Sequence, residues 1–300
     1  MAYRFSVTDR SVQAGVRRIA CEQIDKAIAE IENTELPLDE TIFQIRKRCK
    51  KIRGLLRLVR PSFDGYAREN AIFRDAAREL SQLRDGNVLL PTLDRLTGQG
   101  VARNVGLRRA LLDRQSTALP ARDKQEALHA FRKRMVAARS RVRRWRVTPG
   151  GFRGIGDGLL ATYQRAAAAF SQVSGNPADE ALHEWRKLVK YHGCHVRLLQ
   201  SVAPEVMRPR IDEIRRLGRA LGEHHDLAVL VSELPAVDVA QSHIPKIVDL
   251  AHGQQELLVS DAFSIAACLF EERPQEFVAA CQHAWQDWRH SSGSVVKSNG

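Results

Sequence analysis

Basic side chains recur at helical spacing in two separated stretches of the chain. Between Thr41 and Phe63 there is no Asp or Glu, so the ion pairs at four-residue spacing that usually neutralise a surface helix are missing. On a helix that advances about 100° per residue, the cations of each stretch fall on one stripe beside the apolar positions. The first stripe holds Arg46, Lys50, Arg53 and Arg57, and the second holds His183, Arg186, Lys190 and Arg197. Side chains of this kind predict a site for an anion such as phosphate.

A third basic stretch runs from His129 to Gly156 and also contains no Asp or Glu. Arg132, Arg139 and Arg143 share one face of the helix expected there. A solvated surface helix would account for any one of these stretches. Three of them favour a bound polyanion, because like charges held together destabilise the fold by repulsion and an anion offsets that cost.

Two aspartates, Asp85 and Asp226, are placed where they could orient arginines. A carboxylate that holds a guanidinium in one rotamer pre-organises it for a phosphate group. An ordinary ion pair that serves packing alone explains the same spacing, and both interpretations stay open. The arginines on the same predicted helix face are Arg74 and Arg78 for Asp85, and Arg215 and Arg219 for Asp226.

Prolines and glycines divide the chain into segments with helical periodicity, and no segment shows the alternation of a β-strand. We therefore predict an all-α fold. One Pro and two Gly between Thr148 and Gly151 divide the chain almost equally, which predicts two helical bundles of about four helices each, over residues 1–148 and 149–300. The helices are expected at residues 8–33, 38–59, 66–96 with a kink before Pro91, 121–147, 152–173, 178–202, 208–233, 244–270 and 274–290.

The two halves resemble each other in sequence. The stretch Phe43–Val59 aligns with His183–Leu199, 140 positions further along, and basic residues match at four positions. The stretch Arg74–Leu89 aligns with Arg215–Leu230 at an offset of 141. Two blocks in the same order and at nearly the same offset favour an internal duplication over chance.

The composition agrees with a polyanionic partner. The 300 residues include 47 Lys and Arg against 35 Asp and Glu, which gives a net charge of +12, and 37 of the basic residues are Arg. Apolar residues make up 44% of the chain, which indicates a folded protein rather than a disordered tail. The five cysteines are far apart and lack the short paired spacings of metal and redox motifs, which favours a reducing compartment. With no signal peptide and no apolar run of about 18 residues, we expect a soluble cytoplasmic protein that makes no membrane contact.

The histidines invite a metal or catalytic interpretation, which their positions do not favour. His192 lies on the apolar side of its predicted helix and is expected to be a packing residue. His224 and His225 are adjacent, so they point about 100° apart on a helix and cannot easily share a metal ion. No acidic cluster lies nearby to supply oxygen ligands for a divalent ion. We therefore expect no metal, no cofactor and no enzymatic activity.

Nucleic acid is the main alternative partner, because Arg and Lys contacts to its phosphates do not depend on sequence. Single-strand binders also present aromatic side chains for base stacking. Here aromatics are 6% of the chain, and Trp185, Phe43 and Tyr163 are expected to be buried within helical patterns. A helical scaffold that docks an acidic protein would need apolar anchors at the centre of the basic patch, and none is evident.

Two strings of residues resemble the CHAD family, the conserved histidine α-helical domain. The first is His183-Glu184-Trp185-Arg186-Lys187 with Lys190-Tyr191, and the second is Leu221-Gly222-Glu223-His224-His225-Asp226-Leu227. The first half carries counterparts in Arg46, Lys47, Lys50 and Arg53, followed by Leu83-Arg84-Asp85. The resemblance spans about residues 8–285, so that both halves together resemble one CHAD domain.

The resemblance implies two antiparallel four-helix bundles related by a pseudo-twofold axis, with a central basic groove that binds inorganic polyphosphate without catalysis. It also implies an association with polyphosphate granules in the cytoplasm. A general nucleic-acid backbone binder stays the alternative. The phosphate contacts carried over by position are Arg46, Lys50, Arg53, Arg57, Arg74 and Arg78 in the first half, and His183, Arg186, Lys190, Arg197, Arg215 and Arg219 in the second.

The chain departs from the family pattern at two positions. Phe43 stands opposite His183, and Gly193 stands opposite Arg53, so unequal contributions from the two halves are expected. The Glu-x-Glu-x-Lys signature of the triphosphate-processing CYTH domain, which many relatives carry, is absent from this sequence. The residues indicate neither an oligomeric state nor a preferred polyphosphate chain length.

Overall fold

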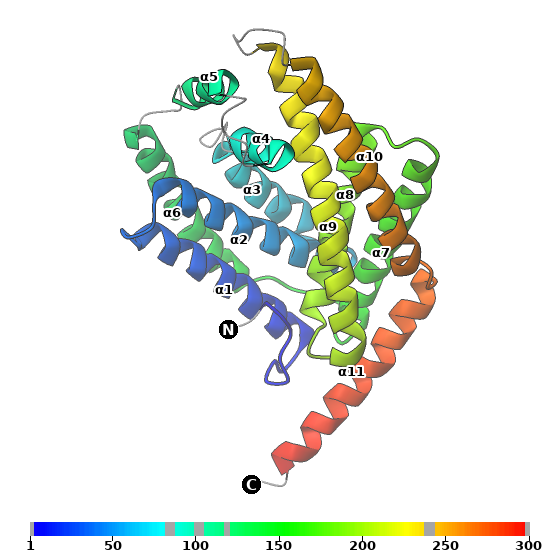
Figure 1. Cartoon of the computed structure of the whole chain (residues 1–300). Helices are drawn as coiled ribbons and strands as arrows, with labels where there is room; N and C mark the ends of the chain where they lie inside the picture. The colour runs from blue at the N-terminus through cyan, green and yellow to red at the C-terminus, as the bar shows by residue number, and fades with distance from the viewer. Residues whose placement is uncertain (1–2, 82–87, 99–104, 117–120, 237–243, 298–300) are drawn as a thin grey trace.

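The structure is a computed structural model that describes residues 3–81, 88–98, 105–116, 121–236 and 244–297 (Figure 1). Within these ranges the regular structure is entirely helical, which confirms the predicted all-α class. None of the described helices has an apolar stretch long enough to cross a bilayer. The α-helices are α1 (Val12–Glu32), α2 (Leu38–Leu58), α3 (Tyr66–Glu79), α4 (Leu89–Thr97), α5 (Val105–Ser116), α6 (Ala121–Val142), α7 (Arg153–Gly175), α8 (Asp179–Leu198), α9 (Pro204–Glu233), α10 (Ile244–Leu269) and α11 (Pro274–Lys297). Short 3₁₀ helices follow α2 at Arg60–Ser62 and α9 at Leu234–Ala236.

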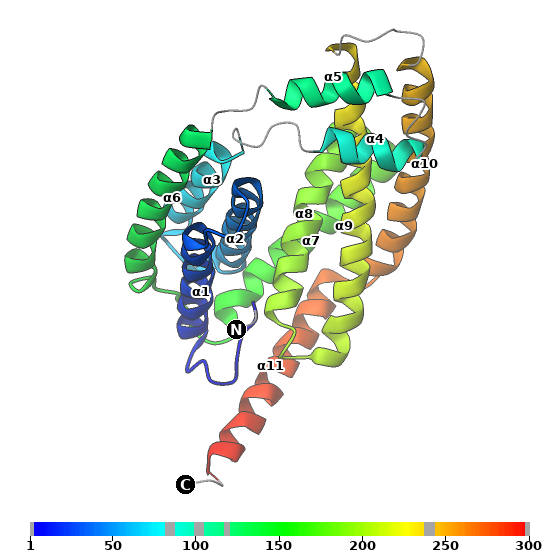
Figure 2. The same cartoon turned by 60° about the vertical axis from the view of Figure 1, so that its left-hand side comes forward.

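The helices fall into two sets of neighbours that meet along α2 (Figures 1 and 2). Helices α1, α2, α3 and α6 form the first set, and α7, α8, α9 and α10 form the second. Helix α2 packs against both α7 and α8, and residues of both sets share one hydrophobic core. Helix α4 lies on α9, and α11 packs on α7 before its C-terminal half projects from the body (Figure 2). A division into duplicated four-helix bundles at residue 148, related by a pseudo-twofold axis, stays a prediction.

The apolar faces of α2 and α8 are buried where the sequence periodicity places them. Ile45, Cys49 and Ile52 of α2 are fully buried, as are Trp185 and Val189 of α8. Spacings of three and four residues keep these side chains on one side of each helix. The basic stripes are therefore left at the border of the core.

Two glycines let α2 approach its neighbours in the second set. A Cβ atom on Gly54 would lie 2.8 Å from the Cβ of Cys194 on α8. A Cβ atom on Gly158 of α7 would overlap the backbone carbonyl group of Leu58. A larger residue at either position would push the helices apart. These contacts hold the basic stripe of α2 in place relative to α8.

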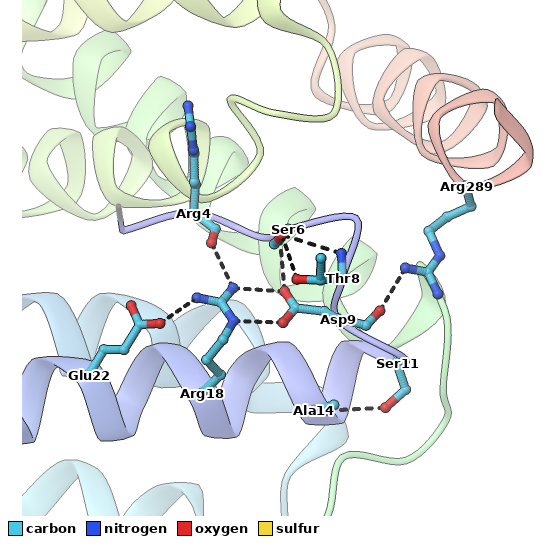
Figure 3. Close-up of polar contacts among 9 residues, drawn as sticks. All are labelled: Arg4, Ser6, Thr8, Asp9, Ser11, Ala14, Arg18, Glu22 and Arg289. Carbon is cyan, nitrogen blue, oxygen red and sulfur yellow. Dashed lines mark hydrogen bonds and ion pairs between the residues drawn. The ribbon is translucent and has the colours of Figure 1, made fainter. Parts of the chain in front are cut away.

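The segment before α1 contacts three helices, and Figure 3 shows its contacts with α1 and α11. Arg18 of α1 donates to both carboxylate oxygens of the buried Asp9, at 2.6 and 2.8 Å. Arg289 of α11 donates to the backbone carbonyl oxygen of Asp9 at 2.7 Å. The backbone amide of Phe5 donates to the carbonyl oxygen of Leu198, the last residue of α8, at 2.9 Å. The N-terminal segment thus holds α8 and α11 against α1.

Several helix ends differ from the sequence prediction: α1 begins at residue 12 rather than 8, α6 ends at 142 rather than 147, α8 ends at 198 rather than 202, and α11 ends at 297 rather than 290. Three other differences concern the region of α3 and α4, helix α5 and the start of α9. The predicted helix 66–96 is wrong, because the structure has two helices there, α3 and α4, and α4 packs on α9. Helix α5 has no counterpart in the prediction, since Arg108 and Arg109 interrupt the apolar pattern after Leu107. Helix α9 begins at Pro204 rather than at residue 208. Proline is favourable in the first turn of a helix, where Pro204 lies. Pro209 lies one turn further on, and the backbone N–H that it lacks would have donated to a carbonyl oxygen of the first turn, so the helix forgoes one hydrogen bond near its start.

Candidate functional site

Helices α2 and α8 bring the two predicted basic stripes together. Lys50 of α2 and Arg186 of α8 lie close enough to Lys190 of α8 to act on its ionisation. Burial is the largest cause that lowers the pKa of Lys190 to about 7, and the two neighbouring positive charges add to it. Asp226 of α9 opposes this shift. We call the following residues the central cluster: Lys50, His183, Arg186, Lys190, His225 and Asp226.

Arg186 is partly desolvated and has an unsatisfied donor. Its Nε is buried and donates no hydrogen bond to the described residues. Burial lowers the pKa of the guanidinium, and the charge of Asp226 opposes that effect. Gly222 of α9 makes room for the side chain, because a Cβ atom there would lie 3.2 Å from Nη2 of Arg186. A desolvated cation with an unused donor favours an anion as its partner.

His183 of α8 and His225 of α9 face each other within the central cluster. Their Nδ1 atoms lie 3.2 Å apart, and their ring centroids lie 4.1 Å apart. Burial is the main cause that lowers the pKa of both imidazoles, and nearby cations such as Arg186 contribute. His183 is among the phosphate contacts predicted from the sequence, and His225 is not. The signal that could have found it is the repeat, which aligns His225 with the basic Arg84.

Asp226 pairs with an arginine that helix spacing does not indicate. Nη2 of Arg95, on α4, lies 3.6 Å from Oδ2 of Asp226, and Nη1 lies 3.9 Å from Oε1 of Glu223. The prediction that Asp226 orients Arg215 or Arg219 is therefore wrong in its partner. The physical reason is that α4 docks on α9 and places Arg95 beside the carboxylate of Asp226. No local sequence signal identifies Arg95, because the contact depends on tertiary packing.

The other cations of the two stripes make individual contacts. The guanidinium of Arg57 lies 4.0 Å from the ring centroid of Tyr191 on α8, and its Nε is buried without a hydrogen-bond partner among the described residues. Arg53 donates from Nε to Oδ1 of Asn70 on α3 at 3.2 Å. Each of these two residues therefore connects α2 to a neighbouring helix. The remaining two stripe residues, Arg46 and Arg197, are half-buried.

Exposed arginines lie on the neighbouring helices α3 and α9. Arg74 pairs with the adjacent Asp75 at 2.8 Å, and Arg215 pairs with Asp212 at 2.5 Å. Within the described ranges, no carboxylate pairs with the exposed Arg78 and Arg219. The predicted orienting residue of the first half, Asp85, lies outside the described residues.

Helix α6 packs on α1, and two of its three predicted contacts are ion-paired there. Nη2 of Arg132 lies 2.6 Å from Glu32, and Nε of Arg139 lies 2.5 Å from Asp25. The expectation that this basic stretch lacks acidic partners is therefore wrong. Both carboxylates belong to α1, so spacing within α6 cannot reveal them. Arg143 is exposed and forms no ion pair with a described residue.

The remaining histidines lie as predicted. His192 is fully buried, and its ring centroid lies 4.9 Å from that of Tyr163. Nε2 of His224 lies 3.6 Å from Asp179, whereas the adjacent His225 faces α8, so the two side chains diverge. In the part of the chain that the structure describes, no three His, Cys, Asp or Glu side chains gather closely enough to hold a metal ion.

Burial of the aromatic residues is confirmed at two of the three positions named from the sequence. Trp185 and Tyr163 are fully buried. Phe43 is 40% exposed, so its predicted burial is wrong. On a helix that advances about 100° per residue, Phe43 falls beside Lys50 on the basic stripe rather than beside the buried Ile45.

A family model for the CHAD domain matches residues 18–235. This chain belongs to the CHAD domain family. The part that matches the CHAD model begins in α1 and ends in the 3₁₀ helix after α9, so it contains the whole central cluster. Among solved structures, the chain is similar to PptA from Streptomyces chartreusis, with a TM-score of 0.55 and 17% sequence identity over 84% of this chain and 97% of that chain. At this identity the likeness concerns the fold. None of the curated proteins matches this CHAD chain.

Proposed function

We propose that this CHAD domain binds inorganic polyphosphate in a basic groove between α2 and α8, without chemical conversion of the ligand. The central cluster is the observation that carries the proposal. Lys50 of α2 and Arg186 of α8 act there on Lys190 of α8, and the carboxylate of Asp226 acts on both Lys190 and Arg186. Packing positive charges in this way costs folding free energy, which a polyanion offsets.

The proposed contacts come from both sets of helices. We further propose that these sets are the duplicated bundles indicated by the sequence repeat. Gly54 and Cys194, which the repeat aligns, meet at the contact between α2 and α8, as a twofold axis would require. Arg132, Arg139 and Arg143 are left out, because their helix α6 packs on α1 at the side of the first set away from α8 (Figure 2), and α1 supplies ion-pair partners for two of them. The proposed contacts are Arg46, Lys50, Arg53, Arg57, Arg74, Arg78, His183, Arg186, Lys190, Arg197, Arg215 and Arg219.

The proposed mechanism is multivalent binding. Each cation holds one phosphoryl unit, and every contact raises the effective concentration of the next unit along the chain. The buried Nε atoms of Arg57 and Arg186, which lack partners among the described residues, are donors that phosphate oxygens can satisfy. Polyphosphate needs neither base stacking nor readout of base edges. Trp185 and Tyr163 are buried and unavailable for stacking, and Phe43 is the exposed one of the three aromatic residues named from the sequence.

The test is a titration of the purified protein with long-chain polyphosphate at physiological salt. Single-stranded RNA and double-stranded DNA of matched charge serve as competitors, and the release of inorganic phosphate is followed in parallel. We expect submicromolar binding that neither nucleic acid displaces, without release of phosphate. Equal binding of the nucleic acids would identify a general polyanion binder, and sustained phosphate release would contradict binding without chemistry.

A further inference from the structure

The contact between His183 and His225 restricts where protons can lie. With the two Nδ1 atoms 3.2 Å apart, one ring donates Nδ1–H and the other accepts with its Nδ1 lone pair. The donor ring then has an unprotonated Nε2, and the acceptor ring carries Nε2–H. Within the described part of the chain, neither Nε2 has a hydrogen-bond partner. One added proton on the donor ring leaves the Nδ1 contact intact and produces two Nε2–H donors that point away from it.

The surroundings hold this pair in its neutral form. Burial is the largest cause that lowers the pKa of each imidazole. The cations of α8 act in the same direction, while Glu184 and Asp226 oppose them. The charged groups that face the pair are Glu184, Arg186, Lys187 and Lys190 of α8 and Asp226 of α9, and Arg95 of α4 pairs with Asp226.

We propose that His183 and His225 form a phosphate-binding site that takes up one proton when polyphosphate binds, so that binding tightens as the pH falls. This inference rests on the proposed function. The proton comes from solvent, adds to Nε2 of the donor ring and returns to solvent when the ligand leaves. The bound phosphate then accepts hydrogen bonds from two Nε2–H groups that share one positive charge.

The sequence repeat indicates that the proposed proton uptake belongs to the second half of the chain. Phe43 and Arg84 stand where the second half has His183 and His225. An arginine stays charged at every physiological pH, whereas a pair of histidines can gain or lose a proton. The second half therefore adjusts its charge to pH, and the first half does not.

The thermodynamic linkage between proton binding and polyphosphate binding gives the direction and the size of the pH dependence. A phosphate group beside the pair opposes the influence of burial and of the cations, so the pair binds its proton more tightly in the complex. Each unit by which the ligand raises the pKa of the pair corresponds to about a tenfold gain in affinity at low pH. Lys190 contributes little at pH 6, because with a pKa of about 7 it is mostly protonated before the ligand arrives.

The experiment is calorimetric titration with long-chain polyphosphate at pH 6.0 in two buffers of different ionisation enthalpy, which counts the protons taken up. We compare the wild type with His183→Gln, His225→Gln and His225→Arg, and use His129→Gln on the exposed side of α6 as the matched control. We expect the wild type and the control to take up protons when polyphosphate binds. His183→Gln and His225→Gln lose most of this uptake, and His225→Arg also loses it, because its cation is present before the ligand binds.

Two other outcomes separate the inference from the proposal on which it rests. Tight binding with the same proton uptake in wild type, His225→Gln and His225→Arg, or with no uptake in the wild type, would overturn the role of the histidine pair alone. No binding of polyphosphate by the wild type at pH 6.0 or pH 7.5 would overturn the proposed function and this inference with it. Because His225→Arg keeps a cation at the position, its binding also shows that the fold is intact.

Discussion

Lys190 shows at the residue scale how stability and binding oppose each other. Desolvation, with the nearby charges of Arg186 and Lys50, lowers its pKa to about 7, so that near neutral pH the free protein holds this charge at a cost in free energy. An apolar residue would remove that cost but would also remove a cation from the proposed groove. Native proteins accept such local costs at functional sites.

The pH dependence of stability follows from histidines, lysines and cysteines that are desolvated in the native state, and burial lowers the pKa of His195 to about 4 and that of His192 well below its ordinary value. Lys190 and Lys51 have pKa values of about 7 and about 8, below the ordinary value, so the unfolded chain holds more protons between pH 6 and 8 and rising pH favours the native state. Above about pH 9 the thiols oppose this trend, because burial raises the pKa of Cys49 and Cys281 to about 12 and the unfolded thiols ionise first. We expect the free energy of unfolding from urea denaturation to rise between pH 6 and 8 and to level off above about pH 9.

The control for this prediction is the double variant Lys51→Met/Lys190→Met. The rise between pH 6 and 8 should become smaller in the variant, by up to about 1 kcal/mol once solvent screening of the exposed part is allowed for. A rise of the same size in both proteins would show that these two lysines are not its source.

Tyr191 is a positioning residue for Arg57 in this account. Its ring lies 4.0 Å from the guanidinium, and a cation–π contact contributes about 0.5–2 kcal/mol. We expect Tyr191→Leu to weaken polyphosphate binding by about three- to tenfold, measured by titration at constant salt. Tyr191→Phe keeps the ring and should bind like the wild type. Weakened binding in Tyr191→Phe would assign the effect to the hydroxyl group instead.

At the scale of elements, the close approach of α2 and α7 is the contact most sensitive to substitution. Gly158→Ala places a Cβ atom into the carbonyl group of Leu58, so we expect a loss of about 2 kcal/mol or more in urea denaturation. Gly253→Ala on α10 is the matched control, because a Cβ atom there meets nothing within 4 Å and alanine favours the helix. Equal stability of the two variants would mean that the contact between α2 and α7 adjusts without cost.

Local periodicity was enough to predict most helices and the basic stripes. Apolar spacing defines the buried sides of α2 and α8, and the cations that border them follow from the same angular arithmetic. The divergence of His224 and His225 follows in the same way. These features depend on residues within a few positions of one another, which is the range where sequence patterns are informative.

Contacts between helices could not be predicted in this way. Arg139 is neutralised by Asp25, and Asp226 is paired with Arg95, although both partners lie on other helices. The break between α3 and α4 depends on the docking of α4 on α9. Leu93 of α4 packs there with residues of α5, α9 and α10 in a second, smaller hydrophobic cluster. Tertiary burial of this kind overrides the continuous helical pattern of residues 66–96.

At the scale of the whole molecule, the net charge of +12 and the multivalent site predict strong dependence on salt. A flexible polyanion releases condensed counterions when several cations bind it, so affinity falls as salt rises. We expect the dissociation constant for polyphosphate to increase about a hundredfold or more between about 50 and 200 mM NaCl. A change of less than about threefold over this range would indicate that few charge contacts form.

The most direct test of the central claim is charge reversal on each side of the proposed groove. The variants are Arg46→Glu/Lys50→Glu on α2 and Arg186→Glu/Lys190→Glu on α8, each compared with Arg165→Glu/Lys246→Glu, which changes the net charge equally at exposed sites on α7 and α10. Circular dichroism checks that helicity is kept. We predict that polyphosphate binds each groove variant at least about tenfold more weakly than the control pair. Equal affinity of all three variants would contradict a binding site formed by α2 and α8.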